Sequence, residues 1–236
     1  MDAGKAVGQC AFEMLFTRNV PHILEKIFFS LDYESFQTCF KVNRAWNELL
    51  SSESYQKITT KMQIEKGKNE KKIWDMSDLG NTSEVKQLVS AGGWMNMNCV
   101  AGQYQSTPLY QAAYHGHTDV VKVLLHGGAD PDKANSSGNT PLHRAASGNH
   151  KKTVQLLLHG KADPNKMNQS GITPLHMATH YTALHDYTEV VQVLLDAGAD
   201  PDQAAHNGIS PLFRCKYFGR KEMVQLLLKE GQILIR

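Results

Sequence analysis

From residue 107 onward, apolar and polar segments alternate along the chain with a period of 33 to 37 residues. Each period starts with Thr or Ser followed by Pro and Leu, at Thr107, Thr140, Thr173 and Ser210. Small residues follow, then an apolar run such as residues 120–125, then a glycine-containing stop. Self-similarity at a fixed period is the signature of a repeat architecture, so this part of the chain is predicted to be a stack of repeats.

Each repeat is predicted to contain two helices. Thr or Ser can cap the first helix, and proline is well suited to its first turn because the missing N–H has no partner there. The small residues let a neighbouring helix approach, and the Val/Leu-rich second helix supplies an apolar face for stacking. Gly128 and Gly198 follow second helices, where a left-handed residue ends a helix. Polar stretches such as residues 133–137 then form the fingers between repeats.

The 33-residue period and the Thr-Pro-Leu-His tetrapeptides beginning at Thr140 and Thr173 resemble the ankyrin repeat. Gly80 and Gly92 have the same spacing of 12 as Gly116 and Gly128, which indicates a degenerate repeat before the first regular one. The predicted solenoid therefore has about four repeats, with β-hairpin fingers. Its units are residues 73–106 (degenerate), 107–139, 140–172, 173–209 and 210–236 (the C-terminal cap).

Two features mark departures from the regular repeat. Lys216 occupies the position held by Ala113, Ala146 and Thr179, which is tolerable only where no further repeat covers it. The third repeat carries four extra residues within 181–187, either a tolerated loop or a contact for a partner.

Residues 17–53 follow a different, helical rhythm. Pro21, Ile23, Leu24, Ile27, Phe28 and Leu31 form an apolar face. Asp32 can cap a second helix carrying Phe36 and Cys39, and a third helix follows from Val42 through Trp46. A segment this short rarely buries a self-sufficient core, so its apolar side chains must also cover another surface. That surface could be the repeat stack or a second protein.

This segment resembles the F-box, with matches at Pro21, Leu24, Ile27, Phe28, Leu31, Asp32, Val42, Arg44 and Trp46. It departs from the family pattern at Val20 and Asn43, and Pro21 lies one residue closer to Leu24 than usual. The expected fold is all-α: a tail at 1–16, a three-helix F-box at 17–53, a lysine-rich linker helix at 54–72, then the ankyrin solenoid.

The two resemblances imply a function. F-box modules dock on the Skp linker protein, which connects them to a cullin-RING ligase, and the ankyrin stack would bind the substrate. The chain is therefore expected to be a non-catalytic adaptor of an SCF-type ubiquitin ligase. Two alternatives remain open: an ankyrin scaffold or tether acting without ubiquitin transfer, and a pathogen effector that hijacks host Skp.

Composition limits other classes of function. A formal net charge of +2 gives no basic excess for nucleic acid. No 18-residue apolar run predicts a membrane span, and residues 1–10 lack a signal-peptide core. The four cysteines are far apart, and no catalytic or metal-binding motif accompanies the histidines. We expect no cofactor, no metal, and an intracellular location, cytoplasmic and/or nuclear.

Two sets of site residues follow. The expected Skp-binding residues are Pro21, Ile23, Leu24, Ile27, Phe28, Leu31, Phe36, Val42 and Trp46. The expected substrate-binding residues lie at exposed positions of the first helices, on the concave face. They are Tyr114, His115, Arg144, Met177, His180, Tyr181, Arg214, Tyr217 and Phe218. Their rings and arginines match the composition of protein-binding hot spots.

Overall fold

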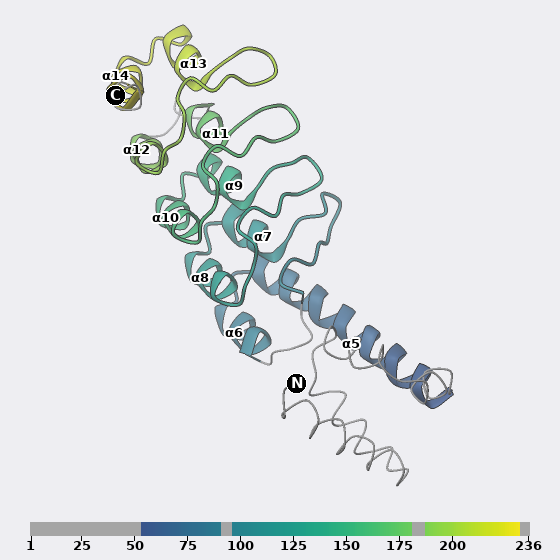
Figure 1. The fold of residues 1–236 in the computed structure, drawn as a ribbon. Helices are drawn as coiled ribbons and strands as arrows, with labels where there is room; N and C mark the ends of the chain where they lie inside the picture. Colours follow the sequence, from purple (N-terminus) through teal and green to yellow (C-terminus); the bar gives the residue numbers. More distant parts are fainter. Residues whose placement is uncertain (1–52, 91–95, 181–186, 232–236) are drawn as a thin grey trace, which may run out of the picture. The chain divides into compact units, whose positions relative to one another are not determined.

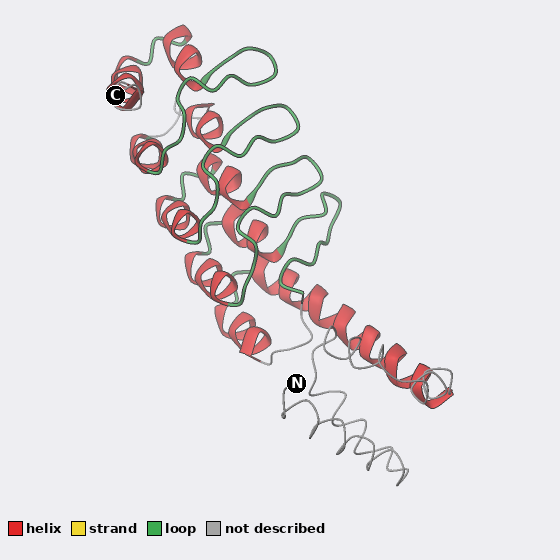
Figure 2. Cartoon of the chain, in the orientation of Figure 1, coloured by secondary structure: helices red, strands yellow, loops and turns green. Residues whose placement is uncertain are grey.

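The computed structural model describes residues 53–90, 96–180 and 187–231, and the regular structure within these ranges is helical (Figure 2). The chain divides into two compact units, residues 1–69 with 91–95, and residues 70–90 with 96–236. The predicted F-box at 17–53 lies outside the described residues. The second unit contains the repeats and is described below.

The repeat unit is built from pairs of short helices arranged in two rows (Figure 1). One row contains the first helices of the regular repeats: α7 (Pro108–Tyr114), α9 (Pro141–Ser147), α11 (Pro174–His180) and α13 (Pro211–Tyr217). The other row contains the second helices: α6 (Thr82–Ser90), α8 (Thr118–His126), α10 (Lys151–His159), α12 (Thr188–Asp196) and α14 (Lys221–Gly231). Loops project from the first-helix row, away from the second helices.

The predicted helix starts are confirmed. The side-chain oxygens of Thr107, Thr140 and Ser210 accept hydrogen bonds from backbone N–H groups three residues later, and a proline follows each of them. The glycines after the second helices are also in place, since Gly128 and Gly198 have φ angles of +87° and +86°. An L-residue at such a φ is strained, which explains glycine at the end of these helices.

The core follows the sequence period. Leu109, Leu142 and Leu175 of the first helices are fully buried, as is Leu124 of α8. Full burial of one such side chain stabilises the fold by roughly 1.5–3 kcal/mol. The small pairs predicted to allow close approach are buried too: Ala112 with Ala113, Ala145 with Ala146, and Ala178 with Thr179. Small side chains at these positions let successive first helices pack directly on one another.

The degenerate first repeat takes its first helix from the end of a long one. Helix α5 (Glu53–Asp78) covers the predicted linker helix at 54–72, and its residues 70–78 belong to the repeat unit. There Ile73 is fully buried, and the indole Nε1–H of Trp74 donates to the carbonyl oxygen of Ser106 at 2.9 Å. Gly80 has a φ of +73°, close to the +70° of Gly116, and Val85 is fully buried, as is Val121.

The expectation of β-hairpin fingers is wrong for the described residues. Their fingers are loops, and the one bridge between extended residues joins Ala101 and Ser106. In the later fingers two backbone bonds close a tight turn: Asn135 N–H donates to the Asn139 carbonyl and Gly138 N–H to the Asn135 carbonyl, and Asn168, Ile172 and Gly171 repeat this arrangement. Bonds confined to the turn do not form the continuous ladder of a β-strand.

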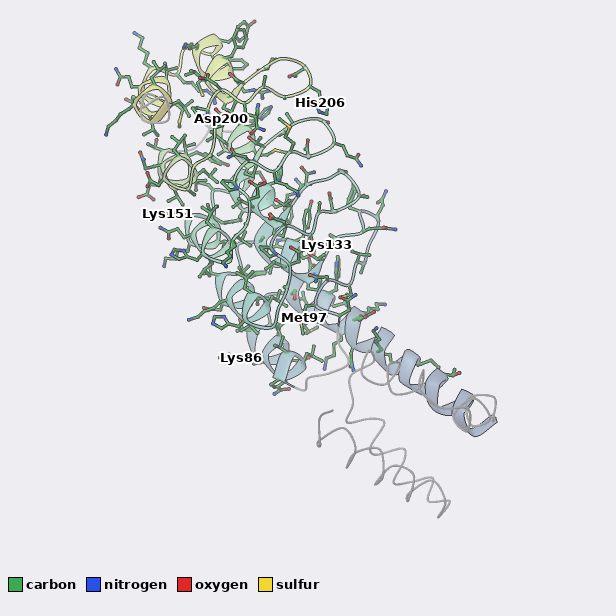
Figure 3. All side chains as sticks on the ribbon, viewed as in Figure 1. Lys86, Met97, Lys133, Lys151, Asp200 and His206 are labelled. Carbon is green, nitrogen blue, oxygen red and sulfur yellow. The ribbon has the colours of Figure 1, made fainter. Side chains whose placement is uncertain are left out.

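The bases of the fingers connect each repeat to the next. The backbone N–H of Asp130 donates to Asn98 Oδ1 at 2.8 Å, that of Asp163 to Asp132 Oδ1 at 3.1 Å, and that of Asp200 to Asn165 Oδ1 at 2.8 Å. Figure 3 labels Asp200 here, Lys133 and His206 on the loops, and Lys86 and Lys151 on the second helices. Because the bonds repeat at each junction, they fix the register of the stack.

Candidate protein-binding surface

The predicted substrate-binding residues lie at the C-terminal ends of the first helices and just beyond them. Tyr114, His180 and Tyr217 are exposed at equivalent positions, and His115 and Phe218 are exposed in the turns that follow. One turn earlier, Arg144, Met177 and Arg214 are half-buried. Tyr181 and every predicted Skp-binding residue lie outside the described residues.

Large aromatic side chains are exposed to solvent at this surface. The exposed fraction is 49% for Tyr114, 76% for Tyr217 and 61% for Phe218. Phe213, one helical turn before Tyr217, is 56% exposed. The rings of Tyr217 and Phe218 meet edge to face, with centroids 5.2 Å apart. Exposed rings that cluster in this way are typical of protein-binding sites.

Arg144 connects two repeats through tyrosine side chains. Its Nε–H donates to the hydroxyl oxygen of Tyr110, and its guanidinium carbon lies 5.5 Å and 5.6 Å from the ring centroids of Tyr110 and Tyr114. The Tyr110 hydroxyl also accepts from Asn135 Nδ2 at 3.1 Å. Arg144 was predicted to bind substrate, and in the structure it also connects its own repeat to the preceding one. The guanidinium also holds the exposed Tyr114 ring in place.

At the other end of the row, charged and aromatic groups from the first repeat lie beside those of the second. His115 Nε2 lies 3.1 Å from Asp78 Oδ1, and the His115 ring stacks on His117 with centroids 5.5 Å apart. His117 Nε2 lies 3.0 Å from the carbonyl oxygen of Asp78. Tyr114 meets His115 edge to face at 4.8 Å. The groups at this end of the surface are therefore paired with one another.

The last repeat presents a basic end. Arg220 donates from its guanidinium to the Thr179 carbonyl oxygen, and its guanidinium carbon lies 5.5 Å from the Phe218 ring centroid. Burial lowers the pKa of His180, and the positive charges of Arg214 and Arg220 lower it further. His180 is therefore neutral at physiological pH, and the positive charge around it comes from the arginines.

The buried histidines are structural. The Thr140 N–H donates to His143 Nδ1 at 3.1 Å, so Nε2 carries the proton and donates to the Ile172 carbonyl oxygen at 2.9 Å. His176 repeats this arrangement with Thr173 and Ile209. Burial lowers the pKa of His143 to about 4 and lowers that of His176, so both rings are neutral at pH 7.

The described ranges contain no metal site, and their two cysteine thiols are not ionised. Within residues 53–90, 96–180 and 187–231, no group of three or more His, Cys, Asp or Glu side chains is arranged to hold a metal ion. Burial raises the pKa of the Cys99 thiol to about 12 and also raises that of Cys215, so both thiols are protonated at neutral pH. No helix of the described part is long and apolar enough to cross a bilayer.

Three residues that shape this surface were not predicted from the sequence. Phe213 aligns with His143 and His176, which are buried beneath the next repeat, whereas Phe213 is exposed. That alignment could have identified it. Tyr110 and Arg220 act through partners 34 and 41 residues away, and no local pattern in the sequence indicates such pairs.

Comparison with known proteins agrees with the geometry. A family model for ankyrin repeats in three copies matches residues 73–168 and again residues 160–235. Together the two matches span 73–235, more than half of the 236 residues. A search of curated proteins finds no match to the chain. The chain therefore belongs to the ankyrin-repeat family, whose stacked repeats are scaffolds for protein–protein interaction.

Proposed function

We propose that this chain is the substrate-binding adaptor of an SCF-type ubiquitin ligase. Residues 17–53 would dock on Skp, and the ankyrin stack would bind the protein to be ubiquitinated. The docking half is supported by the F-box resemblance between residues 24 and 46. The binding half is supported by the row of exposed rings at the ends of the first helices, above all Tyr217.

The mechanism is catalysis by proximity. A substrate held on the stack has a high effective concentration near the ubiquitin-conjugating enzyme, which Skp and the cullin scaffold bring to the same complex. The adaptor needs no nucleophile or general base of its own, because the other subunits supply the chemistry. Its two requirements are a stable connection to Skp and a receptor surface that keeps its shape.

Copurification with Skp tests the docking half. We expect the full chain to retain Skp on affinity beads, and Leu24→Asp to abolish this because an unpaired charge in an apolar interface costs several kcal/mol. Leu79→Asp is the matched control. Leu79 is 70% exposed at the end of the first repeat's opening helix, so a charge there has no burial cost. Undiminished retention of Skp by Leu24→Asp would refute the docking assignment.

Loss of captured target tests the receptor half. We expect Tyr114→Ala, Arg144→Ala and Tyr217→Ala each to weaken capture of the ubiquitinated target by more than about 1 kcal/mol while Skp binding persists. Because Arg144 also contacts Tyr110, that variant needs a parallel measurement of stability. If all three variants captured the target as the parent does, the residues 181–187 would be the next surface to test.

A scaffold that acts without ubiquitin transfer is the second candidate. The family matches lie entirely within residues 73–235, and an ankyrin stack needs no F-box to bind partners. A chain that captures a partner protein but never retains Skp would favour this function. The Skp experiment therefore distinguishes the two candidates.

A further inference from the structure

We infer that the last repeat recognises an acidic segment of the partner protein that also carries aromatic or aliphatic side chains. The binding surface, here named the α13 surface, consists of Phe213, Arg214, Lys216, Tyr217, Phe218 and Arg220. The inference rests on the proposed protein-binding function and names the kind of segment that this end of the stack takes. Three observations carry it: exposed rings, uncompensated charge, and polarity along the row of first helices.

The rings of the α13 surface are exposed where interior repeats bury theirs. Tyr110, His143 and His176 are nearly or fully buried, whereas Phe213 at the equivalent position is 56% exposed. On a helix, residues three and four apart are neighbours, so Phe213 adjoins Tyr217 and Lys216. The Tyr217 ring meets that of Phe218 edge to face, and the Arg220 guanidinium carbon lies 5.5 Å from the Phe218 ring centroid. The result is one continuous patch of rings edged by cations.

The positive charge of the patch exceeds the acidic charge near it in the sequence. Residues 203–222 contain four Lys or Arg residues (Arg214, Lys216, Arg220 and Lys221) and one acidic residue, Glu222. Among the described residues, the ion pairs join Lys72 to Glu84, His115 to Asp78 and Lys151 to Glu189, so Arg214 and Lys216 have no such partner. A partner's carboxylates would complement them at close range.

The row of first helices is polarised. In its first repeat, residues 70–78 contain three acidic residues and two lysines, so the charge there is slightly negative. Its last repeat contributes the arginines and the lysine of the α13 surface, so the charge there is positive. An extended partner segment would therefore bind with its acidic end on α13. The opposite orientation would place its carboxylates beside Asp75 and Asp78, where like charges repel.

A nucleic acid or an anionic membrane fits this surface less well. The preceding repeat, residues 173–209, contains five acidic residues and no Lys or Arg. A polyanion longer than the α13 surface would extend over this net-acidic repeat, which offers it no lysine or arginine. A short acidic stretch within a protein avoids this repeat, since its charge is local.

Selection from a random peptide library displayed on phage, with the full chain as bait, tests the inference. We expect the enriched peptides to be acidic and to contain aromatic or aliphatic residues. Their binding, measured by fluorescence anisotropy of the synthetic peptides, should weaken at least about tenfold in the double variant Arg214→Glu with Lys216→Glu. It should also weaken as ionic strength rises. Lys122→Glu with Lys152→Glu is the control, because it makes the same change of charge at exposed positions of second helices.

Each other outcome overturns the assignment. Enriched peptides that are neutral or basic, an unchanged affinity in the Arg214/Lys216 double variant, or no enrichment would each refute an acidic-segment site. Tighter binding of a single-stranded DNA oligonucleotide, or of phosphatidylserine-containing vesicles, would replace it with a polyanion site. Enriched peptides of another chemistry that still require Tyr217 would leave the protein-binding function intact. Failure of the parent chain to retain Skp, by contrast, would refute only the proposed role in a ubiquitin ligase and would not bear on the acidic-segment site.

Discussion

The Nε2–H of His143 donates to the carbonyl oxygen of Ile172 at 2.9 Å, and Ile172 lies two residues before α11, the first helix of the next repeat. The other ring nitrogen accepts from the Thr140 N–H. One neutral imidazole thereby caps its own helix and fastens the repeat to its successor. Protonation of Nδ1 would remove the acceptor of the Thr140 N–H and would place a charge in a buried site.

Stability should therefore fall in mild acid. Burial holds the pKa of His143 near 4 in the folded chain, below the ordinary value of 6.5. Between these pH values the unfolded chain binds more protons, so stability is full above pH 6.5 and decreases as the pH falls toward 4. Urea unfolding at neutral and acidic pH checks this. In His143→Gln, whose amide can still cap the helix, the acid loss should shrink. If His143→Gln lost as much stability in acid as the parent chain does, the loss would belong to other groups. His159→Gln, at an exposed histidine, is the control for removal of an imidazole.

A lysine side chain should strongly destabilise the fold at an interior position of the stack and have little effect in the last repeat. Ala146 is fully buried between repeats, whereas the equivalent Lys216 is exposed. We expect Ala146→Lys to destabilise the fold by more than about 3 kcal/mol, because the ammonium would be buried without a partner. Lys216→Ala should change stability by less than about 0.5 kcal/mol. Thermal melts of both variants measure the difference, and similar melting temperatures would show that the repeat register is wrong.

Removing one hydroxyl should loosen a contact between repeats. The Tyr110 oxygen accepts from both Arg144 and Asn135, and Tyr110 is nearly buried. Tyr110→Phe leaves these donors without their acceptor and should cost about 1–3 kcal/mol in urea unfolding. Tyr104→Phe, at an exposed tyrosine on the first finger, is the control and should be neutral. Equal stability of the two variants would mean that water replaces the lost acceptor.

Equivalent finger glycines should differ in their tolerance of alanine. Gly138 and Gly208 have φ angles of +79° and +77°, so alanine is strained at either by about 1–2 kcal/mol. A Cβ on Gly138 would lie 2.8 Å from the backbone nitrogen of Gln169 in the next finger, while one on Gly208 meets nothing within 4 Å. Gly138→Ala should therefore be the more destabilising in thermal melts. A larger loss at Gly208 would contradict the packing of the fingers.

Local signals in the sequence predicted most of the repeat stack. The caps at Thr107, Thr140 and Ser210 and the buried alanines depend on residues three or four positions apart, so a single repeat contains the information. The β-hairpin fingers were expected from the polar stretches between repeats, such as residues 133–137, and from the family resemblance. Their strands do not form because the backbone bonds within each finger are confined to a tight turn, such as those among Asn135, Gly138 and Asn139.

The candidate surface was harder to predict. Register placed Tyr114 and Tyr217 at exposed positions correctly, because the helical period determines which side faces solvent. Register could not reveal that Arg144 lies against Tyr110 and Tyr114, since that contact crosses between repeats and depends on the rotamer of a long side chain. The Skp-binding prediction at residues 17–53 remains a prediction.

The bonds at the finger bases also bear on how the chain folds. They join residues only 31 to 35 positions apart, as from Asn98 to Asp130 and from Asn165 to Asp200, and each reaches no further than the adjoining repeat. Contacts this short in sequence impose little loop-closure entropy, so low contact order should make folding of the stack fast. Two adjoining repeats can act as a nucleus, and structure then spreads by one helix pair at a time. During synthesis, the early repeats could thus be structured before the α13 surface leaves the ribosome.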